Sequence, residues 1–94
     1  MIASFGDRAT EALYHGKQAR RRFPPDVVAV ALRKLDMLNS ARTLADLRSP
    51  PGNRLEALQG DLNGFHSVRV NDQWRLVFRW HGKEIHEVRL TDYH

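Results

Sequence analysis

The sequence predicts an α+β fold, with helices in the first half of the chain and a small antiparallel sheet in the second half. Apolar residues recur at helical spacing between Pro25 and Asn39. After the turn-forming stretch "SPPGN", short segments alternate between apolar and polar residues and are separated by further turn residues. This order of elements is typical of helices that pack on one face of a sheet. Because the chain has 94 residues and no linker or repeat, we expect residues 1–94 to form a single domain.

The composition is typical of a soluble globular protein. Hydrophobic residues make up 41% of the chain and charged residues 28%, which does not fit a disordered segment. No apolar run approaches the roughly 20 residues that a membrane span needs, and the N-terminal stretch "MIASFGDRAT" lacks the apolar core of a signal peptide. The chain has no cysteine, so we expect neither disulfides nor a thiolate metal site and assign the protein to the cytoplasm, away from membranes.

The charge balance is basic and is carried mainly by arginine. Lys and Arg number 15 against 11 Asp and Glu, which gives a net charge of +4, and only Lys17, Lys34 and Lys83 are lysines. Arginine binds phosphate through paired hydrogen bonds and stacks on bases, so this balance is compatible with a nucleic-acid partner. Charge alone leaves open the simpler interpretation that these side chains keep a small domain soluble.

The first half of the chain predicts two helices after a short strand. "MIASF" alternates apolar residues and could form that strand, and Asp7 is a suitable N-cap for a helix that ends near Gly16. Pro24 and Pro25 suit the entrance of the second helix, which we expect to run to about Asn39. Its predicted apolar stripe consists of Val28, Ala31, Leu32, Leu35 and Leu38.

The second half begins with a short turn and then predicts a meander of strands. In "TLADLRS", Thr43 is a suitable N-cap, with Leu44 and Leu47 facing inward. "RLEAL" is a candidate strand and "GDLNG" has the composition of a turn. "FHSVRV" and "QWRLVFRW" flank "ND" as a hairpin, and "IHEVRL" forms the last strand after the turn "HGKE".

Alternation assigns the hairpin residues to two faces. If Val70 pairs with Trp74, the apolar side chains coincide and Arg69 lies opposite Arg75. The predicted core face then consists of Val68, Val70, Trp74, Leu76 and Phe78. Arg79 joins the two arginines on the second face, and like charges directly opposite each other are destabilising. This face therefore calls for an anion or a nearby acid, unless the arginines simply lie along a solvated surface.

The histidines show no metal-ligand spacing, so we expect no metal site. His66 and His86 are most simply partly buried structural side chains, and His81 is a turn residue. His94 differs from them because it follows Asp92 and Tyr93 directly.

Several short motifs occur in a fixed order. They are "LxxLxGD" from Leu55 to Asp61, Gly64, "SVRVNDQWRLVF" from Ser67 to Phe78, and the terminal "DYH" of Asp92, Tyr93 and His94. Together with "MIASF", the central helix and the "DL" of Asp46 and Leu47, they resemble the HigB group of RelE-superfamily toxins. The resemblance covers nearly the whole chain and is least constrained between Lys17 and Asp26.

The resemblance implies a fold, an activity and partners. Toxins of this group are ribosome-dependent endoribonucleases that cut messenger RNA in the decoding site without a metal or cofactor. Their RelE-like fold packs helices on one face of an antiparallel-dominated sheet and leaves an open basic face opposite. A cognate antitoxin, usually a HigA-like helix-turn-helix protein, holds them inactive. We therefore expect the toxin of a type II toxin–antitoxin system, which inhibits translation and growth and whose other partners are the ribosome and messenger RNA.

The resemblance also implies roles for the residues at the matching positions. RNA carries its own nucleophile, the 2′-OH, so cleavage needs an acid, a base and stabilisation of the phosphoryl oxygens. Asp92 and His94 are the expected acid and base, in either order. Tyr93 orients the phosphate, stacks on a base or shares the proton transfer, and Arg75 is the expected phosphate clamp.

Two positions depart from the family pattern. Well-studied members carry a histidine and a lysine before the "GD" turn, where this chain has Glu56 and Gln59 as auxiliary candidates. Glu56 could act as a base but repels phosphate, and Gln59 has no charge, so we expect a weaker toxin or an altered codon preference. The arginines expected to contact RNA are Arg20, Arg21, Arg22, Arg54, Arg69 and Arg79.

This departure leaves other functions open. The chain could inhibit growth by binding RNA or the ribosome without cleavage, or it could serve mainly as a subunit that binds its antitoxin. The three terminal residues can act together with Arg75 only if the backbone brings them to the same face of the sheet. Because alternation places Tyr93 on the side opposite to Asp92 and His94, the chain must bend after Leu90 to bring all three to the face of Arg75.

Overall fold

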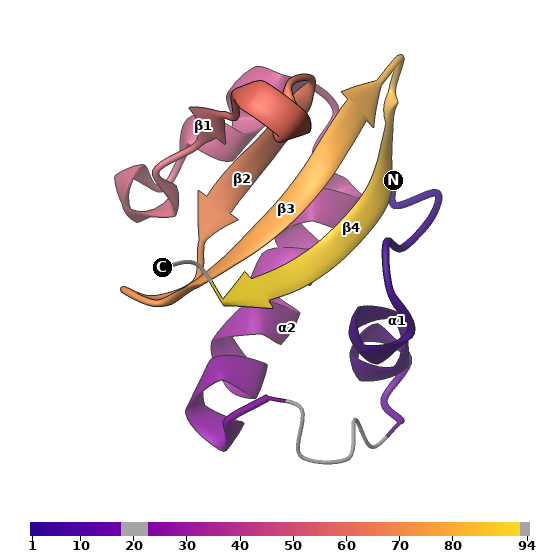
Figure 1. Ribbon diagram of the computed structural model, residues 1–94, viewed down its shortest axis with the longest axis vertical. Coiled ribbons are helices and arrows are strands. Elements are labelled where there is room, and N and C mark those ends of the chain that lie inside the picture. The colour runs from indigo at the N-terminus through magenta and orange to yellow at the C-terminus, as the bar shows by residue number, and fades with distance from the viewer. Residues whose placement is uncertain (18–22, 93–94) are drawn as a thin grey trace.

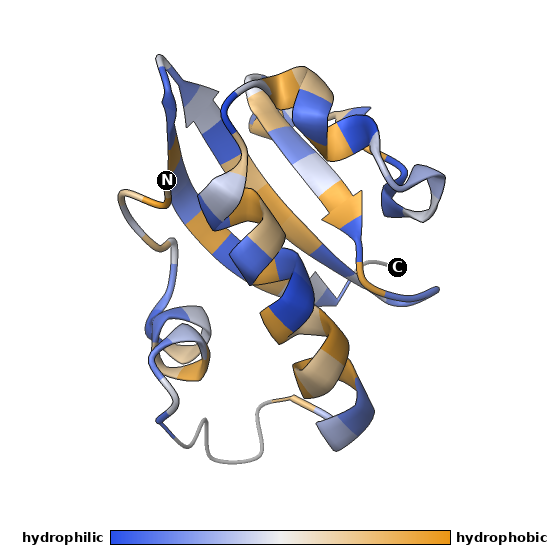
Figure 2. Cartoon of the chain, turned by 180° about the vertical axis from the view of Figure 1, so that it is seen from behind, coloured by the Kyte–Doolittle hydropathy of each residue, from blue (hydrophilic) through white to orange (hydrophobic). Residues whose placement is uncertain are grey.

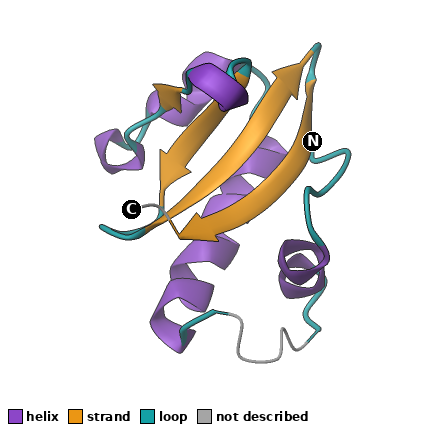
Figure 3. Ribbon diagram, in the orientation of Figure 1, coloured by secondary structure: helices purple, strands orange, loops and turns teal. Residues whose placement is uncertain are grey.

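The computed structural model describes residues 1–17 and 23–92 and places helices against one face of a four-stranded sheet (Figure 1, Figure 3). The elements are α1 (Arg8–Tyr14), α2 (Pro25–Ser40), the 3-10 turns η1 (Leu44–Arg48), η2 (Pro51–Asn53) and η3 (Gly60–Leu62), and the strands β1 (Glu56–Ala57), β2 (Phe65–Arg69), β3 (Trp74–His81) and β4 (Glu84–Asp92). The strand order is β1-β2-β3-β4, and every neighbouring pair is antiparallel. The predicted α+β class is confirmed.

The two helices begin where the sequence predicts. Asp7 accepts a hydrogen bond from Thr10 N at 2.8 Å and caps α1, and Pro25 opens α2. Figure 2 shows α2 from behind, lying across the sheet. Its buried residues are Val27, Ala31, Leu35 and Leu38. No helix within residues 1–17 and 23–92 is long and apolar enough to cross a membrane.

The predicted stripe of α2 is wrong at Leu32, which is 36% exposed, and it omits Val27, which is buried. Val28 is half-buried and packs against the core. The buried row steps by four residues from Val27 to Ala31 and on to Leu35, so it follows one slanting ridge of the helix. Val28 and Leu32 lie on the flank of that ridge.

The N-terminal segment differs from the strand predicted for "MIASF". Ile2 and Phe5 form isolated parallel bridges with Ile85 and Val88 of β4 instead of a strand. The backbone N–H groups of Ala3 and Gly6 donate to the Ile85 and Val88 carbonyls at 2.7 and 2.8 Å. The first residues therefore lie along the outer edge of β4 (Figure 1).

The β2–β3 hairpin has the predicted register. Val70 N donates to Trp74 O at 2.9 Å, and Arg69 lies directly opposite Arg75. The predicted core face is confirmed: Val68, Val70, Leu76 and Phe78 are buried, and Trp74 packs against them partly buried. The 3-10 turn η1 is also confirmed, with a capping box between Thr43 and Asp46 and with Leu47 buried.

A β-bulge interrupts β4 and shifts its alternation. Val77 pairs with Arg89, but Arg79 pairs with His86, so β4 holds one more residue than β3 between these pairs. Glu87 occupies the bulge with φ 56°. As a result Ile85 and Val88, three positions apart, both point into the core and are fully buried.

The second face of the sheet is less open than the resemblance implied. Val77 belongs to this face and is only 1% exposed, and Leu58, which follows β1, is 8% exposed. Leu58 N donates to Phe65 O at 2.9 Å, which continues the pairing of the edge strand. The arginines of this face thus surround buried apolar side chains.

Candidate nucleic-acid interface

Arg75 is the centre of a set of contacts at one edge of the sheet. Its Nε donates to Ser67 Oγ at 2.8 Å, and its Nη2 donates to the Arg54 carbonyl oxygen at 2.6 Å. Its Nη1 lies 3.5 Å from Glu56 Oε1. The Arg75 side chain is 11% exposed, so its guanidinium is held in one position by neighbours on three different segments.

The backbone at Arg54 is shaped by the residue before it. Asn53 is fully buried, and its Nδ2 donates to the carbonyl oxygens of Leu47 and Ser49 at 3.1 Å each. Arg54 follows in the left-handed region, with φ 45° and ψ 58°, and this turn directs its carbonyl oxygen toward Arg75. The Arg54 residue itself is exposed, as an RNA contact requires.

Lys34 of α2 completes this arrangement from the other side. Its Nζ donates to Asn53 Oδ1. Burial lowers the pKa of Lys34, and the charges of Arg33 and Arg69 lower it further. Sequence reasoning missed both Lys34 and Asn53. An asparagine after "PPG" is equally typical of an exposed turn, so only the fold reveals its burial.

The two auxiliary candidates have different surroundings. Glu56 is brought to Arg75, with its side chain 58% exposed. Gln59 is exposed at the N-terminal end of η3, and none of the described side chains hydrogen-bonds to its amide. Glu56 is therefore an acid close to the facing arginines Arg69 and Arg75, as predicted.

Asp92 lies at the same end of the sheet as Arg75, but in register with the opposite face. β4 stays regular through Thr91, which pairs with Arg75, and Asp92, which pairs with Trp74. Gln73 Nε2 donates to Asp92 Oδ2 at 3.0 Å. The bend after Leu90 that would bring the triplet to the face of Arg75 is therefore absent as far as Asp92. Tyr93 and His94 lie outside the described residues, and the catalytic roles of the triplet remain predictions.

The other arginines of the second face are also paired. Arg69 forms an ion pair with the exposed carboxylate of Asp72. Arg79 Nη1 lies 2.8 Å from Glu87 Oε2, and its guanidinium carbon lies 5.8 Å from the centre of the Phe65 ring. Arg20, Arg21 and Arg22 lie outside the described residues.

The histidines are scattered. His66 stacks on Phe78 with ring centres 6.2 Å apart, and burial lowers its pKa. His81 and His86 approach each other edge to face at 6.1 Å. Across residues 1–17 and 23–92, no group of three or more His, Cys, Asp or Glu side chains is placed to hold a metal ion.

Sequence comparisons identify a family. Residues 3–94 match the model of the HigB-like toxin family, described as the RelE-like toxin of the type II toxin–antitoxin system HigB. The chain is 42% identical over 80 residues to Toxin HigB-1 of Vibrio cholerae, covering 85% of this chain and 84% of that protein. It is 35% identical over 86 residues to an uncharacterized protein of Haemophilus influenzae, covering 92% and 85%.

Solved structures show the same fold at low sequence identity. A YafQ variant from E. coli superposes with a TM-score of 0.67 at 15% identity, covering 98% of this chain and 93% of that one. A chain of the YoeB–YefM toxin–antitoxin complex from Staphylococcus aureus gives 0.62 at 18% identity, covering 100% and 98%. The chain belongs to the HigB-like family of RelE-like toxins, and it is the toxin component of a type II toxin–antitoxin system.

Proposed function

We propose that this toxin is a ribosome-dependent endoribonuclease whose 94 residues act as one cytoplasmic domain that cuts messenger RNA. The observation that carries the proposal is the placement of Arg75. Its Nε and Nη2 are held by protein oxygens, while its Nη1 faces the exposed carboxylate of Glu56. An RNA phosphate can replace that carboxylate without moving the guanidinium, so the clamp is preorganised.

The chemistry of RNA cleavage gives each of these residues a role. The 2′-OH of the nucleotide attacks the adjacent phosphorus, and the bond to the 5′-oxygen breaks. A base removes the 2′-OH proton and an acid protonates the leaving oxygen, roles that we assign to Asp92, Tyr93 and His94. Arg75 offsets the charge that develops on the phosphoryl oxygens.

Primer extension on ribosome-bound message tests the proposal. Wild type is compared with Arg75→Ala, Arg75→Lys and His94→Ala after brief expression. We expect wild type to cut and the His94→Ala and Arg75→Ala variants to lose roughly a hundredfold or more in rate, as general acid–base and electrostatic groups do. Arg75→Lys should recover little, because lysine cannot donate to Ser67 Oγ and the Arg54 carbonyl in the same fork.

The outcome separates cleavage from binding. If wild type inhibits growth without cutting, or if His94→Ala inhibits growth as strongly as wild type, the toxin acts by binding RNA or the ribosome. The ion pair between Glu56 and Arg75 is the observation that favours this second function, because it places a negative charge where phosphate would bind.

We also propose that the antitoxin is a HigA-like helix-turn-helix protein. The family match supports an antitoxin partner, since toxins of this class occur in two-component systems. Coexpression with the product of the neighbouring reading frame, followed by copurification, tests this pairing. Failure of the two proteins to copurify, or a partner without a helix-turn-helix pattern, would contradict it.

A further inference from the structure

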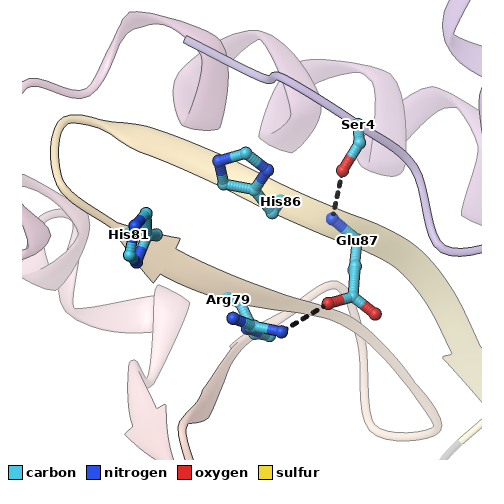
Figure 4. A pocket seen from close by; sticks show the side chains of 5 residues that line it. All are labelled: Ser4, Arg79, His81, His86 and Glu87. Carbon is cyan, nitrogen blue, oxygen red and sulfur yellow. Dashed lines mark hydrogen bonds and ion pairs between the residues drawn. The ribbon is translucent and has the colours of Figure 1, made fainter.

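A hollow of about 270 Å³ lies on the sheet face that carries Arg79, toward the β3–β4 turn (Figure 4). It is lined by Ser4, Arg79, His81, His86 and Glu87. Arg79 is four residues beyond Arg75 on the same strand and face, which corresponds to about 13 Å along β3. An RNA strand held at Arg75 can therefore reach this hollow.

The β4 bulge contributes Glu87 to the lining of the hollow. Glu87 has φ 56°, a backbone conformation that residues other than glycine rarely adopt. The backbone N–H of Glu87 donates to Ser4 Oγ at 2.9 Å. The bulge aims the Glu87 carboxylate at Arg79, whose Nη1 lies 2.8 Å from Oε2 (Figure 4). Bulges often redirect a side chain beside a functional site, and a strained residue kept in place is a reason to look for one.

The hollow presents a defined pattern of hydrogen-bonding groups. The Glu87 carboxylate can only accept hydrogen bonds, and each of its two oxygens has two lone pairs. The ion pair with Arg79 therefore leaves lone pairs that can accept hydrogen bonds from a ligand. The Arg79 guanidinium beside it donates only, and its side chain is 47% exposed. Guanine carries the complementary pattern on its Watson–Crick edge, where the N1–H and N2–H donors lie next to the O6 acceptor.

We propose that this hollow binds a guanine base of the RNA strand, with Glu87 accepting from N1–H and N2–H and Arg79 donating to O6. Adenine, cytosine and uracil do not carry two adjacent donors beside an acceptor. The inference rests on the proposed RNA-cleaving function and adds a sequence preference to it. A single base read in this way sets which messages and codons are cut.

The surroundings favour a base over a phosphate. The Glu87 carboxylate would repel a phosphate at this position. His81 and His86 wall another side of the hollow with ring centres 6.1 Å apart, and imidazole rings are among the surfaces on which unpaired RNA bases stack. Glu84 does not line the hollow, but its Oε1 lies 3.8 Å from Nε2 of the lining residue His86, so a second negative charge nearby adds to the repulsion of phosphate.

Binding of short RNAs to the free protein is the first test. Isotope-labelled protein is titrated with the trinucleotides UGU, UAU, UCU and UUU while the imidazole NMR signals of His81 and His86 are followed. We expect UGU to shift both signals at about a tenfold lower concentration than the other three, which matches the discrimination of one paired base contact. Glu87→Gln should abolish this preference, whereas Glu11→Gln, an exposed glutamate on α1, should keep it.

Mapping of cleavage sites on ribosome-bound message is the second test. Wild type should show guanine enriched at one fixed position near the cut, and Glu87→Gln should remove this enrichment from the sites that it still cuts. Equal responses to all four trinucleotides, or an unchanged cleavage pattern in Glu87→Gln, would overturn the guanine site while leaving the nuclease in place. A preference for UGU in a protein that never cuts would keep the site and reject the nuclease.

Discussion

The Nη2 atom of Arg75 lies 2.6 Å from the carbonyl oxygen of Arg54, a residue in the left-handed conformation. A left-handed arginine is costly by about 1–2 kcal/mol. The turn persists because Asn53 is anchored beneath it by hydrogen bonds to Leu47 and Ser49. The position of the proposed phosphate clamp thus depends on a buried amide that never approaches the substrate.

Asn53→Ala should destabilise the fold by about 2–4 kcal/mol. The change leaves the buried carbonyl oxygen of Leu47 and the partly buried one of Ser49 without this donor, and it opens a small cavity. Urea unfolding measures the loss. Asn63→Ala is the control, because this exposed asparagine should change the free energy of unfolding by less than about 0.5 kcal/mol. Equal effects of the two substitutions would show that Asn53 has no special anchoring role.

Glu56→Gln should increase the affinity for RNA about two- to fivefold. The substitution removes the exposed carboxylate that faces the largely buried Arg75 at 3.5 Å from Nη1, and a two- to fivefold change corresponds to about 0.4–1 kcal/mol. Fluorescence anisotropy with a short labelled RNA, repeated over a salt series, measures the change. Glu11→Gln removes the same charge from α1 and should have little effect. Weaker binding by Glu56→Gln would mean that Glu56 assists the RNA rather than competing with it.

Gly6→Ala should destabilise the N-terminal segment by about 1–3 kcal/mol. A Cβ atom at this position would lie 2.8 Å from the backbone oxygen of Glu87 and 2.5 Å from Arg89 Nε. Gly52→Ala is the matched control, because a Cβ there has no described atom within 4 Å. Thermal unfolding of both variants tests the difference, and a Gly6→Ala protein as stable as wild type would show that the segment shifts freely.

Stability should fall as the pH drops below about 6.5, in part because of His66. Burial lowers its pKa in the folded protein below the ordinary value of 6.5. The unfolded chain therefore binds the proton more readily, and the folded state loses free energy as the pH falls from 6.5 through the lowered pKa. Urea unfolding between pH 5 and 7.5 measures the slope. His66→Phe, which keeps the stack on Phe78, should flatten it, whereas exposed His15→Gln should not.

The parts of the fold that were predictable depend on local sequence. Asp7 starts α1 through its side-chain oxygen and Pro25 starts α2 through its fixed backbone angle. The β2–β3 register follows from alternation across a short turn. The bulge at Glu87 was not predictable, because no glycine marks it and the hydrogen bond from its N–H goes to Ser4, 83 residues away. The αL turn at Arg54 likewise depends on contacts that only the folded chain creates.

In the candidate site, too, features set by local sequence were predictable and features set by distant contacts were not. Alternation correctly placed Arg69 opposite Arg75, and the need for a nearby acid was met by Glu56 and Asp72. The bend after Leu90 that the terminal triplet requires is not made by Thr91 or Asp92, because both residues pair regularly with β3. Ladder hydrogen bonds with a neighbouring strand outweigh the local preferences of a chain end, and these partners are not visible in the sequence.

The bridges of Ile2 and Phe5 to β4 have a consequence for assembly. Open strand edges invite another chain to add a strand, which leads either to specific β-augmentation or to aggregation. Here the N-terminal segment occupies the outer edge of β4, and the opposite edge offers only the two residues Glu56 and Ala57 of β1. A partner strand could therefore pair with β4 next to Ile85 and Val88 only by displacing the N-terminal segment.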